Sequence, residues 1–365
     1  MISVPVICFA AVVLVNCLYY FFYGKFIFSK NAAVTPNNYP VSVIVCAKNE
    51  AENLKKNVPK ILSQQYTNFE VILINDASSD KTLDVIKSFQ QQDPRVKIVD
   101  VVNNEAFWGN KKYALTLGIK KAKHNFLLFM DADCEPASDL WIQQMAGHFS
   151  EKKQLILGYG AYLPKKSLLN RLIRFETAMT AISYFSFAKW GMAYMGVGRN
   201  LAYTSTLFYD TRGFMSHMQV RSGDDDLFVN EAASAFNTEI CFHPEAFTYS
   251  EPKRTWEEWI KQKRRHISTA KLYKFKHKVV LANFTFFNLL FWISIPVMFF
   301  IENWMIVAIL VVFRILMMYI FIGSGIKKLK EPGLVIMLPI FDLMLVCFQW
   351  YVFLKNKISA PVDWK

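Results

Sequence analysis

The sequence predicts an α/β domain with a mostly parallel β-sheet, flanked by transmembrane helices. From Tyr39 to about Ser250, short β-rich apolar runs alternate with segments of helical spacing. Such alternation favours right-handed crossovers and parallel strands. Outside this stretch, one uncharged apolar run opens the chain and three more close it. Each is about as long as a bilayer core requires.

The composition fits a membrane protein better than a soluble one. Of the 365 residues, 53% are hydrophobic and 19% are charged, and the formal net charge is +13. These values exclude a disordered chain. Positive charge also favours nucleic-acid binding, but the basic residues cluster beside apolar segments, so we expect no nucleic-acid partner. The cysteines are scattered without a C-x-x-C pair, which predicts neither disulfides nor a zinc site.

The first apolar run, residues 2–23, predicts a transmembrane anchor over residues 1–24. No basic residue precedes it and no small-x-small cleavage site follows it, which argues against a signal peptide. Because Lys25 and Lys30 follow immediately, the positive-inside rule places the next domain in the cytosol.

The closing runs predict three C-terminal transmembrane segments within residues 279–354. They are residues 279–301, 303–325 and 333–354. A tight turn separates the first two, whereas the basic residues 327–330 fit a cytosolic loop. If the last segment crosses fully, the tail with Lys355, Lys357 and Lys365 falls on the outer side, which counts against four full crossings. The alternative is that the last segment is re-entrant.

Arg314 and Asp342 lie near the middles of the last two apolar segments. A charge inside a membrane is costly and needs a partner or a cavity. The favoured hypothesis is a structural ion pair between them, and the alternative is a position on a substrate pathway.

Four strands and three helices are predicted in the first part of the central domain. The strands are residues 41–46, 69–75, 96–101 and 126–130, and the helices are 50–64, 80–91 and 110–122. Ligands of such sheets bind beyond the carboxyl ends of the strands. Two common nucleotide sites are excluded, because the turn after the first strand lacks glycine and no P-loop sequence is present.

Asp131-Ala132-Asp133 is the sharpest local signal, since it follows a predicted buried strand. Two carboxylates one residue apart can reach one hard cation. Mg²⁺ or Mn²⁺ takes oxygen ligands and commonly bridges to substrate phosphates. The triplet therefore predicts a metal site at Asp131 and Asp133, against the alternative of an ordinary polar loop.

From about Val41 to Ile267 the chain resembles the inverting, membrane-bound glycosyltransferases of family 2, which have the GT-A fold. The matching motifs are residues 43–50 (VIVCAKNE), 75–80 (NDASSD), 109–115 (GNKKYAL), 131–133 (DAD) and 198–202 (GRNLA). The resemblance implies a nucleoside-diphosphate-sugar donor, expected to be a UDP-sugar. It assigns Asn49, Glu50 and Asp76 to the donor nucleoside. It assigns Lys111 and Asp131 to the donor diphosphate and its cation.

Residues 222–227 (SGDDDL) resemble the family motif T/G-E-D-x-x-L, whose Asp is the catalytic base. Counting back from Leu227 places the base at Asp224. Asp225 remains the alternative, because Gly223 replaces the usual Glu and three aspartates stand in a row. An acidic helix start that stabilises the helix dipole would explain one or two of them.

Residues 262–266 (QKRRH) resemble the family motif Q-x-x-R-W. Gln262 and Arg265 match on the donor side, while His266 replaces the acceptor-side Trp. The surrounding residues 251–278 also predict basic amphipathic helices at the bilayer surface, and both interpretations can hold. A second amphipathic stretch, residues 168–195, is either interfacial, presenting a lipid acceptor, or packed on the sheet.

The resemblance thus implies an enzyme that moves a sugar to a hydroxyl of a lipid or glycolipid acceptor, assisted by Mg²⁺ or Mn²⁺. A processive polysaccharide synthase is the alternative among enzymes, although His266 and the few C-terminal segments favour single addition. An inactive nucleotide-sugar-binding membrane scaffold is the alternative of another class. It would have lost the D-x-D or the base.

The expected organisation has four parts. They are an anchor (1–24), a GT-A domain (39–250), basic interface helices (251–278) and three transmembrane segments (279–354). We expect a multi-pass protein of the cell membrane, in contact with membrane lipids, whose catalytic domain is cytosolic.

Overall fold

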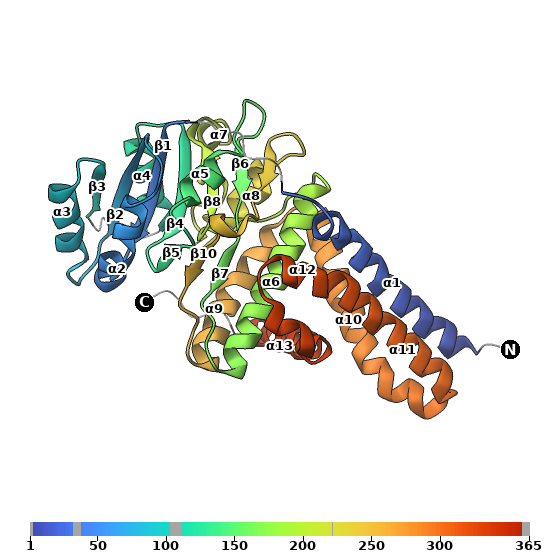
Figure 1. Cartoon of the computed structure of the whole chain (residues 1–365). Coiled ribbons are helices and arrows are strands. Elements are labelled where there is room, and N and C mark those ends of the chain that lie inside the picture. Colours follow the sequence, from blue (N-terminus) through green and yellow to red (C-terminus); the bar gives the residue numbers. More distant parts are fainter. Residues whose placement is uncertain (1–2, 32–37, 103–110, 221, 360–365) are drawn as a thin grey trace. The chain divides into compact units, whose positions relative to one another are not determined.

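The computed structural model describes residues 3–31, 38–102, 111–220 and 222–359, which form two compact units (Figure 1). The helical unit comprises Met1–Ser29, Pro164–Phe187 and Lys253–Lys365. The sheet unit comprises Lys30–Leu163 and Ala188–Pro252. The second amphipathic stretch, residues 168–195, is therefore divided between the two units.

The described part of the sheet unit contains a seven-stranded sheet with the order β3-β2-β1-β4-β8-β6-β9. Its strands are β1 Val41–Ala47, β2 Phe69–Asp76, β3 Val96–Val101, β4 Phe126–Asp131, β6 Leu155–Leu157, β8 Leu201–Thr204 and β9 Thr238–Ile240. β1 pairs in parallel with β2 and β4, whereas β8 runs antiparallel to both β4 and β6. The predicted mostly parallel α/β sheet is confirmed.

All residues of β2 and nearly all of β1 are buried, as expected for strands covered on both faces. The covering helices are α2 Ala51–Leu62, α3 Thr82–Gln92 and α4 Lys111–Lys121, close to their predicted positions. The predicted start of the last helix at Asn110, with Gly109 of its motif, lies outside the described residues. A smaller sheet with the order β5-β10-β7 joins Cys134–Pro136, Thr248–Ser250 and Gly160–Tyr162.

The remaining helices of the sheet unit are short. They are α5 Trp141–Ala146, α7 Ser205–Asp210, the 3₁₀ turn Met215–His217, α8 Asp226–Ala232 and the 3₁₀ turn Pro244–Ala246. Of these, α8 matters most for the site, because Asp224 and Asp225 directly precede it.

The helical unit contains α1 Val4–Ile27, α6 Leu168–Lys189 up to Phe187, α9 Trp256–Thr269, α10 Phe275–Ile301, α11 Trp304–Met318, a π-helical stretch Tyr319–Gly323, α12 Ser324–Lys328, a 3₁₀ helix Pro332–Met337 and α13 Leu338–Ile358. Among the described residues, four segments are long and apolar enough to cross a membrane. They are Val4–Ile27, Phe275–Ile301, Trp304–Lys328 and Pro332–Ile358. They match the four predicted apolar runs.

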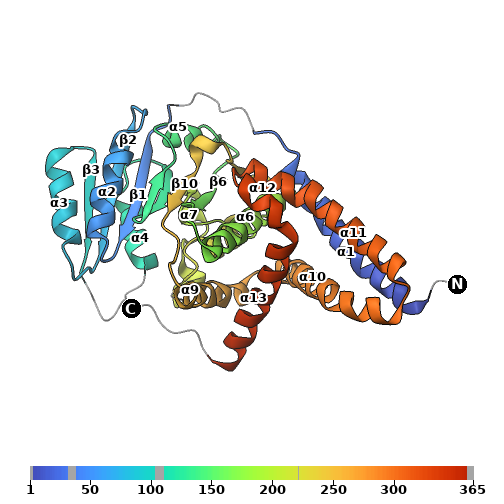
Figure 2. The ribbon, with the colours of Figure 1, turned by 60° about the horizontal axis from the view of Figure 1, so that its bottom comes forward.

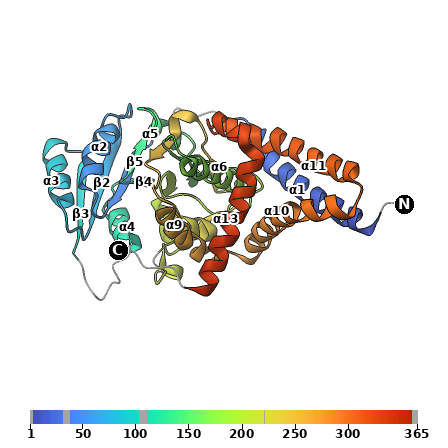
Figure 3. The same ribbon diagram turned by 90° about the horizontal axis from the view of Figure 1, so that it is seen from below.

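Helices α1, α10 and α11 lie side by side, whereas α13 runs in a different direction (Figures 2 and 3). Arg314 of α11 and Asp342 of α13 form an ion pair of 2.9 Å. Arg314 is fully buried, and Asn288 and Trp292 of α10 also donate hydrogen bonds to the carboxylate, at 3.0 and 2.9 Å. The favoured hypothesis of a structural ion pair is confirmed.

Candidate active site

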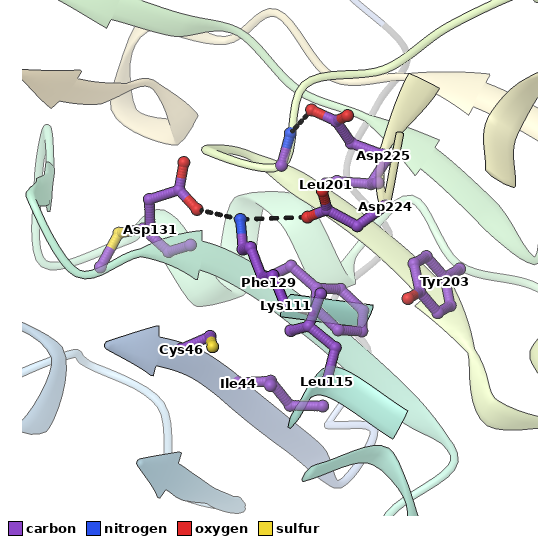
Figure 4. Close-up of a pocket in the computed structure, with 12 residues that line it drawn as sticks. Ile44, Cys46, Lys111, Leu115, Phe129, Asp131, Leu201, Tyr203, Asp224 and Asp225 are labelled. Atoms are coloured by element: carbon purple, nitrogen blue, oxygen red, sulfur yellow. Dashed lines mark hydrogen bonds and ion pairs between the residues drawn. The ribbon is translucent and has the colours of Figure 1, made fainter. Parts of the chain in front are cut away.

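The pocket of interest lies at the carboxyl-end edge of the parallel strands. Cys46 of β1 is in register with Asp131 at the end of β4, and Ala47 is in register with Asn75 of β2. The pocket at this edge is lined by Cys46, Lys111, Asp131, Gly198, Tyr203, Asp224 and Asp225, with further apolar residues (Figure 4). Such an edge is where ligands of parallel α/β sheets bind.

Lys111, the first residue of α4, lies between two carboxylates. Its Nζ is 2.8 Å from Oδ1 of Asp131 and 3.0 Å from Oδ2 of Asp224 (Figure 4). Burial opposes the charge on Lys111, but the two carboxylates outweigh it and hold its pKa well above the ordinary value. Burial would likewise raise the pKa of Asp224, yet Lys111 lowers it below the ordinary value. Lys111 and Asp224 are therefore both charged at neutral pH.

Asp225 has a different environment from its neighbour. It is the N-cap of α8, and its two oxygens accept hydrogen bonds of 2.7 Å from the backbone N–H groups of Gly198 and Asp226. Burial, and then the adjacent charges of Asp224 and Asp226, raise the pKa of Asp225 to about 7. Two consecutive aspartates thus have pKa values shifted in opposite directions.

The turn after β1 is tied to the loop after β2. Asn49 has a positive φ of 57°, its N–H donates to Oγ of Ser78 (3.0 Å), and its Oδ1 accepts from the N–H of Ser79 (2.8 Å). The N–H of Glu50 donates to Oγ1 of Thr82 at 2.8 Å. The two segments that the sequence assigned to the donor nucleoside are therefore joined.

Asp76 ends β2 and is buried. Burial raises its pKa, although the positive charges of Lys48 and Lys111 oppose the shift. Because Lys111 acts on Asp76 as well as on the pocket carboxylates, the predicted nucleoside-binding Asp lies within the same electrostatic environment.

Asn57 of α2 fixes the backbone of the D-x-D turn. This buried side chain donates from Nδ2 to the carbonyl oxygen of Ala132 at 3.0 Å, between Asp131 and the exposed Asp133. The described part of the chain contains no group of three or more His, Cys, Asp or Glu side chains that could hold a metal. Two carboxylates still fit Mg²⁺ or Mn²⁺, because such ions often keep waters and take substrate phosphates as further ligands.

Gln262, Arg265 and His266 lie on α9 in the helical unit. A capping box of Thr255 and Glu258 begins this helix. Hydrogen bonds from Arg264 connect the helix to the end of α13 in the same unit. The structure thus brings Lys111, Asp131, Asp224 and Asp225 together in the sheet unit and places the Q-x-x-R residues in the other.

Lys112 is a candidate that sequence reasoning missed. It is fully buried, and its Nζ donates to the carbonyl oxygens of His217 (2.7 Å) and Val220 (2.9 Å), in the segment that leads to Asp224. Burial lowers the pKa of Lys112 to about 8. Successive helical residues point about 100° apart, so Lys111 and Lys112 serve different partners, but two adjacent lysines give no sequence signal for this division.

The family model of glycosyl transferase family 2 matches residues 42–215. The poly-beta-1,6-N-acetyl-D-glucosamine synthase of Staphylococcus epidermidis is 26% identical over 242 residues, which are 65% of this chain and 56% of the synthase. The UDP-Glc:alpha-D-GlcNAc-diphosphoundecaprenol beta-1,3-glucosyltransferase WfaP of Escherichia coli is 28% identical over 132 residues, 35% of this chain and 48% of that enzyme. The chain therefore spans about half the length of these relatives.

Among solved structures, the mannosyltransferase PcManGT of Pyrobaculum calidifontis, in complex with GDP-Man and Mn²⁺, has a similar fold. The TM-score is 0.60 at 16% identity, over 93% of this chain and 98% of the mannosyltransferase. The fold is that of a GT-A protein. Residues 42–215 of the chain form a glycosyltransferase family 2 domain.

Proposed function

We propose that this protein is an inverting glycosyltransferase that moves a sugar from a nucleoside-diphosphate-sugar, expected to be a UDP-sugar, to a hydroxyl of a lipid or lipid-linked acceptor. One observation carries the proposal. Lys111 lies between Asp131 and Asp224 at the ligand-binding edge of the sheet. A relative named for a UDP-Glc donor and a diphosphoundecaprenol acceptor supports the substrate classes.

Asp224 is the proposed base, which takes the proton of the acceptor hydroxyl. Its pKa is low while Lys111 is its partner. A donor diphosphate would compete for Lys111, and the loss of this contact would raise the pKa of Asp224 and make it a stronger base. Asp225 is the proposed positioning residue, because its oxygens hold Gly198 and the start of α8.

Asp131 and Asp133 are the proposed ligands of Mg²⁺ or Mn²⁺. When bound, the cation would supply positive charge for the leaving diphosphate. Lys111 adds to this charge. By their motif matches, Asn49, Glu50 and Asp76 fix the nucleoside, Gln262 and Arg265 serve the donor side, and His266 serves the acceptor side.

A processive polysaccharide synthase is the second candidate, because the Staphylococcus epidermidis relative is named as a polymer synthase. His266 in place of Trp favours single addition. The inactive scaffold is disfavoured, because Asp131 and Asp224 are both present and converge on Lys111. The length of the product made from labelled donor, measured on a denaturing gel, separates the two enzymes.

The direct test is a panel of nucleoside-diphosphate-sugars. Release of nucleoside diphosphate from detergent-solubilised protein should depend on one donor and increase with a polyprenyl-linked acceptor. The Asp224→Asn protein is the matched control. No release with any donor, in the presence of Mn²⁺ and acceptor, would contradict an active transferase.

The topology proposal rests on chain connections. β4 pairs with β8, so the residues before and after α6 lie on one side of the membrane, and α6 does not cross. α9 follows directly after the sheet unit and carries the basic residues expected at a bilayer surface. We place the sheet unit, α6 and α9 in the cytosol, because Lys25 lies in the last turn of α1 and Lys30 follows this helix.

Both ends of the last apolar segment contact these two helices. Near its start, Arg174 of α6 pairs with Glu331. At its end, Arg264 of α9 donates to Oδ1 of Asn356 (2.8 Å) and to the carbonyl oxygen of Ser359 (2.7 Å). We therefore propose that the chain crosses the membrane three times, and that the segment Pro332–Ile358 is re-entrant.

Reporter fusions test this topology. Reporters after Lys30, at Lys328 and after Ser359 should all indicate the cytosol, and a reporter inserted at Asn303 should indicate the outer side. The fusion at Lys328 is the internal control for the one after Ser359. An outer-side signal after Ser359 would show a fourth crossing, and a cytosolic signal at Asn303 would overturn the hairpin of α10 and α11.

The Asn57 contact predicts an effect on metal affinity. Asn57→Ala removes the hydrogen bond that fixes Ala132, so the two carboxylates lose their mutual orientation. We expect the Mn²⁺ concentration for half-maximal activity to rise about 10–100-fold, with much of kcat restored at saturating Mn²⁺. Lys55→Ala, on the exposed side of the same helix, is the control. An unchanged Mn²⁺ requirement would show that Asn57 does not position the metal ligands.

A further inference from the structure

A basic pocket of about 570 Å³ lies within the helical unit. The basic side chains that line it are those of Lys165, Lys166, Arg171 and Arg174, and the apolar ones are those of Leu334, Ile336 and Met337. No acidic residue is among the described residues that line it. The pocket therefore combines an excess of positive charge with an apolar wall.

The walls of this basic pocket are fixed. Arg174 donates from Nε to Oε1 of Glu331 at 3.1 Å and from Nη2 to Oε2, and Glu331 is buried. The rings of Phe175 and Phe341 pack with centroids 5.5 Å apart. These contacts hold α6 against the segment that supplies the apolar wall, so Arg174 is a structural member of the pocket.

The loop that carries the two lysines is also ordered by hydrogen bonds. The backbone N–H of Lys165 donates to Oδ1 of Asn170 at 2.7 Å, and the N–H of Asn170 donates to Oγ of Ser167 at 3.1 Å. Lys166 and Arg171 are exposed. A fixed backbone thus presents exposed cations at the rim of the pocket, at a reduced entropic cost for binding.

The apolar wall lies at the end of a membrane span. The 3₁₀ helix Pro332–Met337 begins the candidate span Pro332–Ile358, close behind the candidate span Trp304–Lys328. Ile336 is 82% exposed and Leu168, next to the basic loop, is 50% exposed. Exposed aliphatic side chains beside exposed cations are typical of the bilayer interface, where the acyl region meets the charged headgroups.

We propose that this basic pocket binds the phosphate headgroup of an anionic glycerophospholipid from the adjacent leaflet. Lys166 and Arg171 would donate charge-assisted hydrogen bonds to the phosphate oxygens, and an acyl chain would pack along Ile336 and Met337. Gly333 leaves room, because a Cβ there would meet no atom within 4 Å. Basic pockets between membrane segments bind lipid headgroups in this way. The proposal is independent of the donor site.

The test uses the full chain in mixed micelles of phosphatidylcholine and phosphatidylglycerol. Native mass spectrometry measures how much of each lipid stays bound. The Lys166→Glu/Arg171→Glu protein should lose the preference for phosphatidylglycerol by about tenfold or more. The control, Lys87→Glu/Lys120→Glu, makes the same change in net charge at exposed lysines of α3 and α4 and should keep the preference. Equal retention by both variants would overturn the proposal.

Two further measurements make the outcome specific. The neutral Lys166→Gln/Arg171→Gln protein, which avoids new charge repulsion, should also lose the preference, and its retention of the lipid would count against the site. A polyprenyl phosphate added to the mixed micelles of phosphatidylcholine and phosphatidylglycerol should not displace phosphatidylglycerol from the protein. Displacement would show that the pocket takes the acceptor lipid instead. Nucleoside diphosphate release, measured in parallel, reports separately on the proposed transferase.

Discussion

Asp224→Asn should leave donor binding intact and lower kcat by about 10²–10⁴-fold. Asparagine keeps the shape and can still accept a hydrogen bond, but it cannot take the acceptor proton. Asp224 lines the pocket and contacts Lys111 at 3.0 Å. The substitution therefore changes the carboxylate that contacts the lysine expected at the donor diphosphate. Donor affinity from calorimetry and kcat from nucleoside diphosphate release separate the two effects.

Asp225→Asn is the comparison that fixes the register. The amide oxygen can still accept from Gly198 or Asp226, so we expect a much smaller loss of kcat and a lower melting temperature from the weakened cap of α8. The pKa of about 7 makes Asp225 a reasonable base on chemical grounds alone. A dead Asp225→Asn enzyme beside a nearly normal Asp224→Asn enzyme would move the base by one residue.

Asp133→Ala should abolish metal-dependent turnover without loss of folding. The side chain is exposed, so its removal costs little packing energy, while one of the two proposed cation ligands disappears. Activity of the unaltered protein should vanish with EDTA and return with Mn²⁺ or Mg²⁺.

Asp84→Ala, an exposed carboxylate in the first turn of α3, is the control for the change in charge. Circular dichroism checks that both variants fold alike. Full activity in chelator, or near-normal turnover by Asp133→Ala, would exclude the two-carboxylate metal site.

The parallel half of the sheet could be predicted because each strand is a long apolar run followed by a polar turn. For that reason β1, β2 and β4 appeared at their positions, and Asp76 and Asp131 at their ends. The other half of the sheet, β6, β8 and β9, was not predicted, because these strands have three or four residues each. Such short runs show no periodicity that distinguishes them from loops.

The sequence predicted which motifs contribute residues to the site, but not which of these residues contact one another. The resemblance identified Lys111 and Asp224, but only the fold shows that the ammonium group of Lys111 contacts both Asp224 and Asp131. Asn57 and Lys112 act through backbone carbonyls of distant segments, and such partners leave no trace in a single sequence. The cap role of Asp225 was likewise hidden within three identical residues.

The ion pair of Arg314 and Asp342 has a consequence for how the chain is made. In the proposed topology, α11 enters the membrane before Asp342 is synthesised, and an unpaired arginine at mid-helix costs about 2.5–3.5 kcal/mol on insertion. Helices made earlier already offer oxygens: Oδ1 of Asn288 lies 2.6 Å from Nη2 of Arg314, and Oδ1 of Asn16 lies 3.4 Å from it. These amides can hold the guanidinium until the last segment emerges. Nascent chains that stop before Asp342 would leave the charge of Arg314 with neutral partners only.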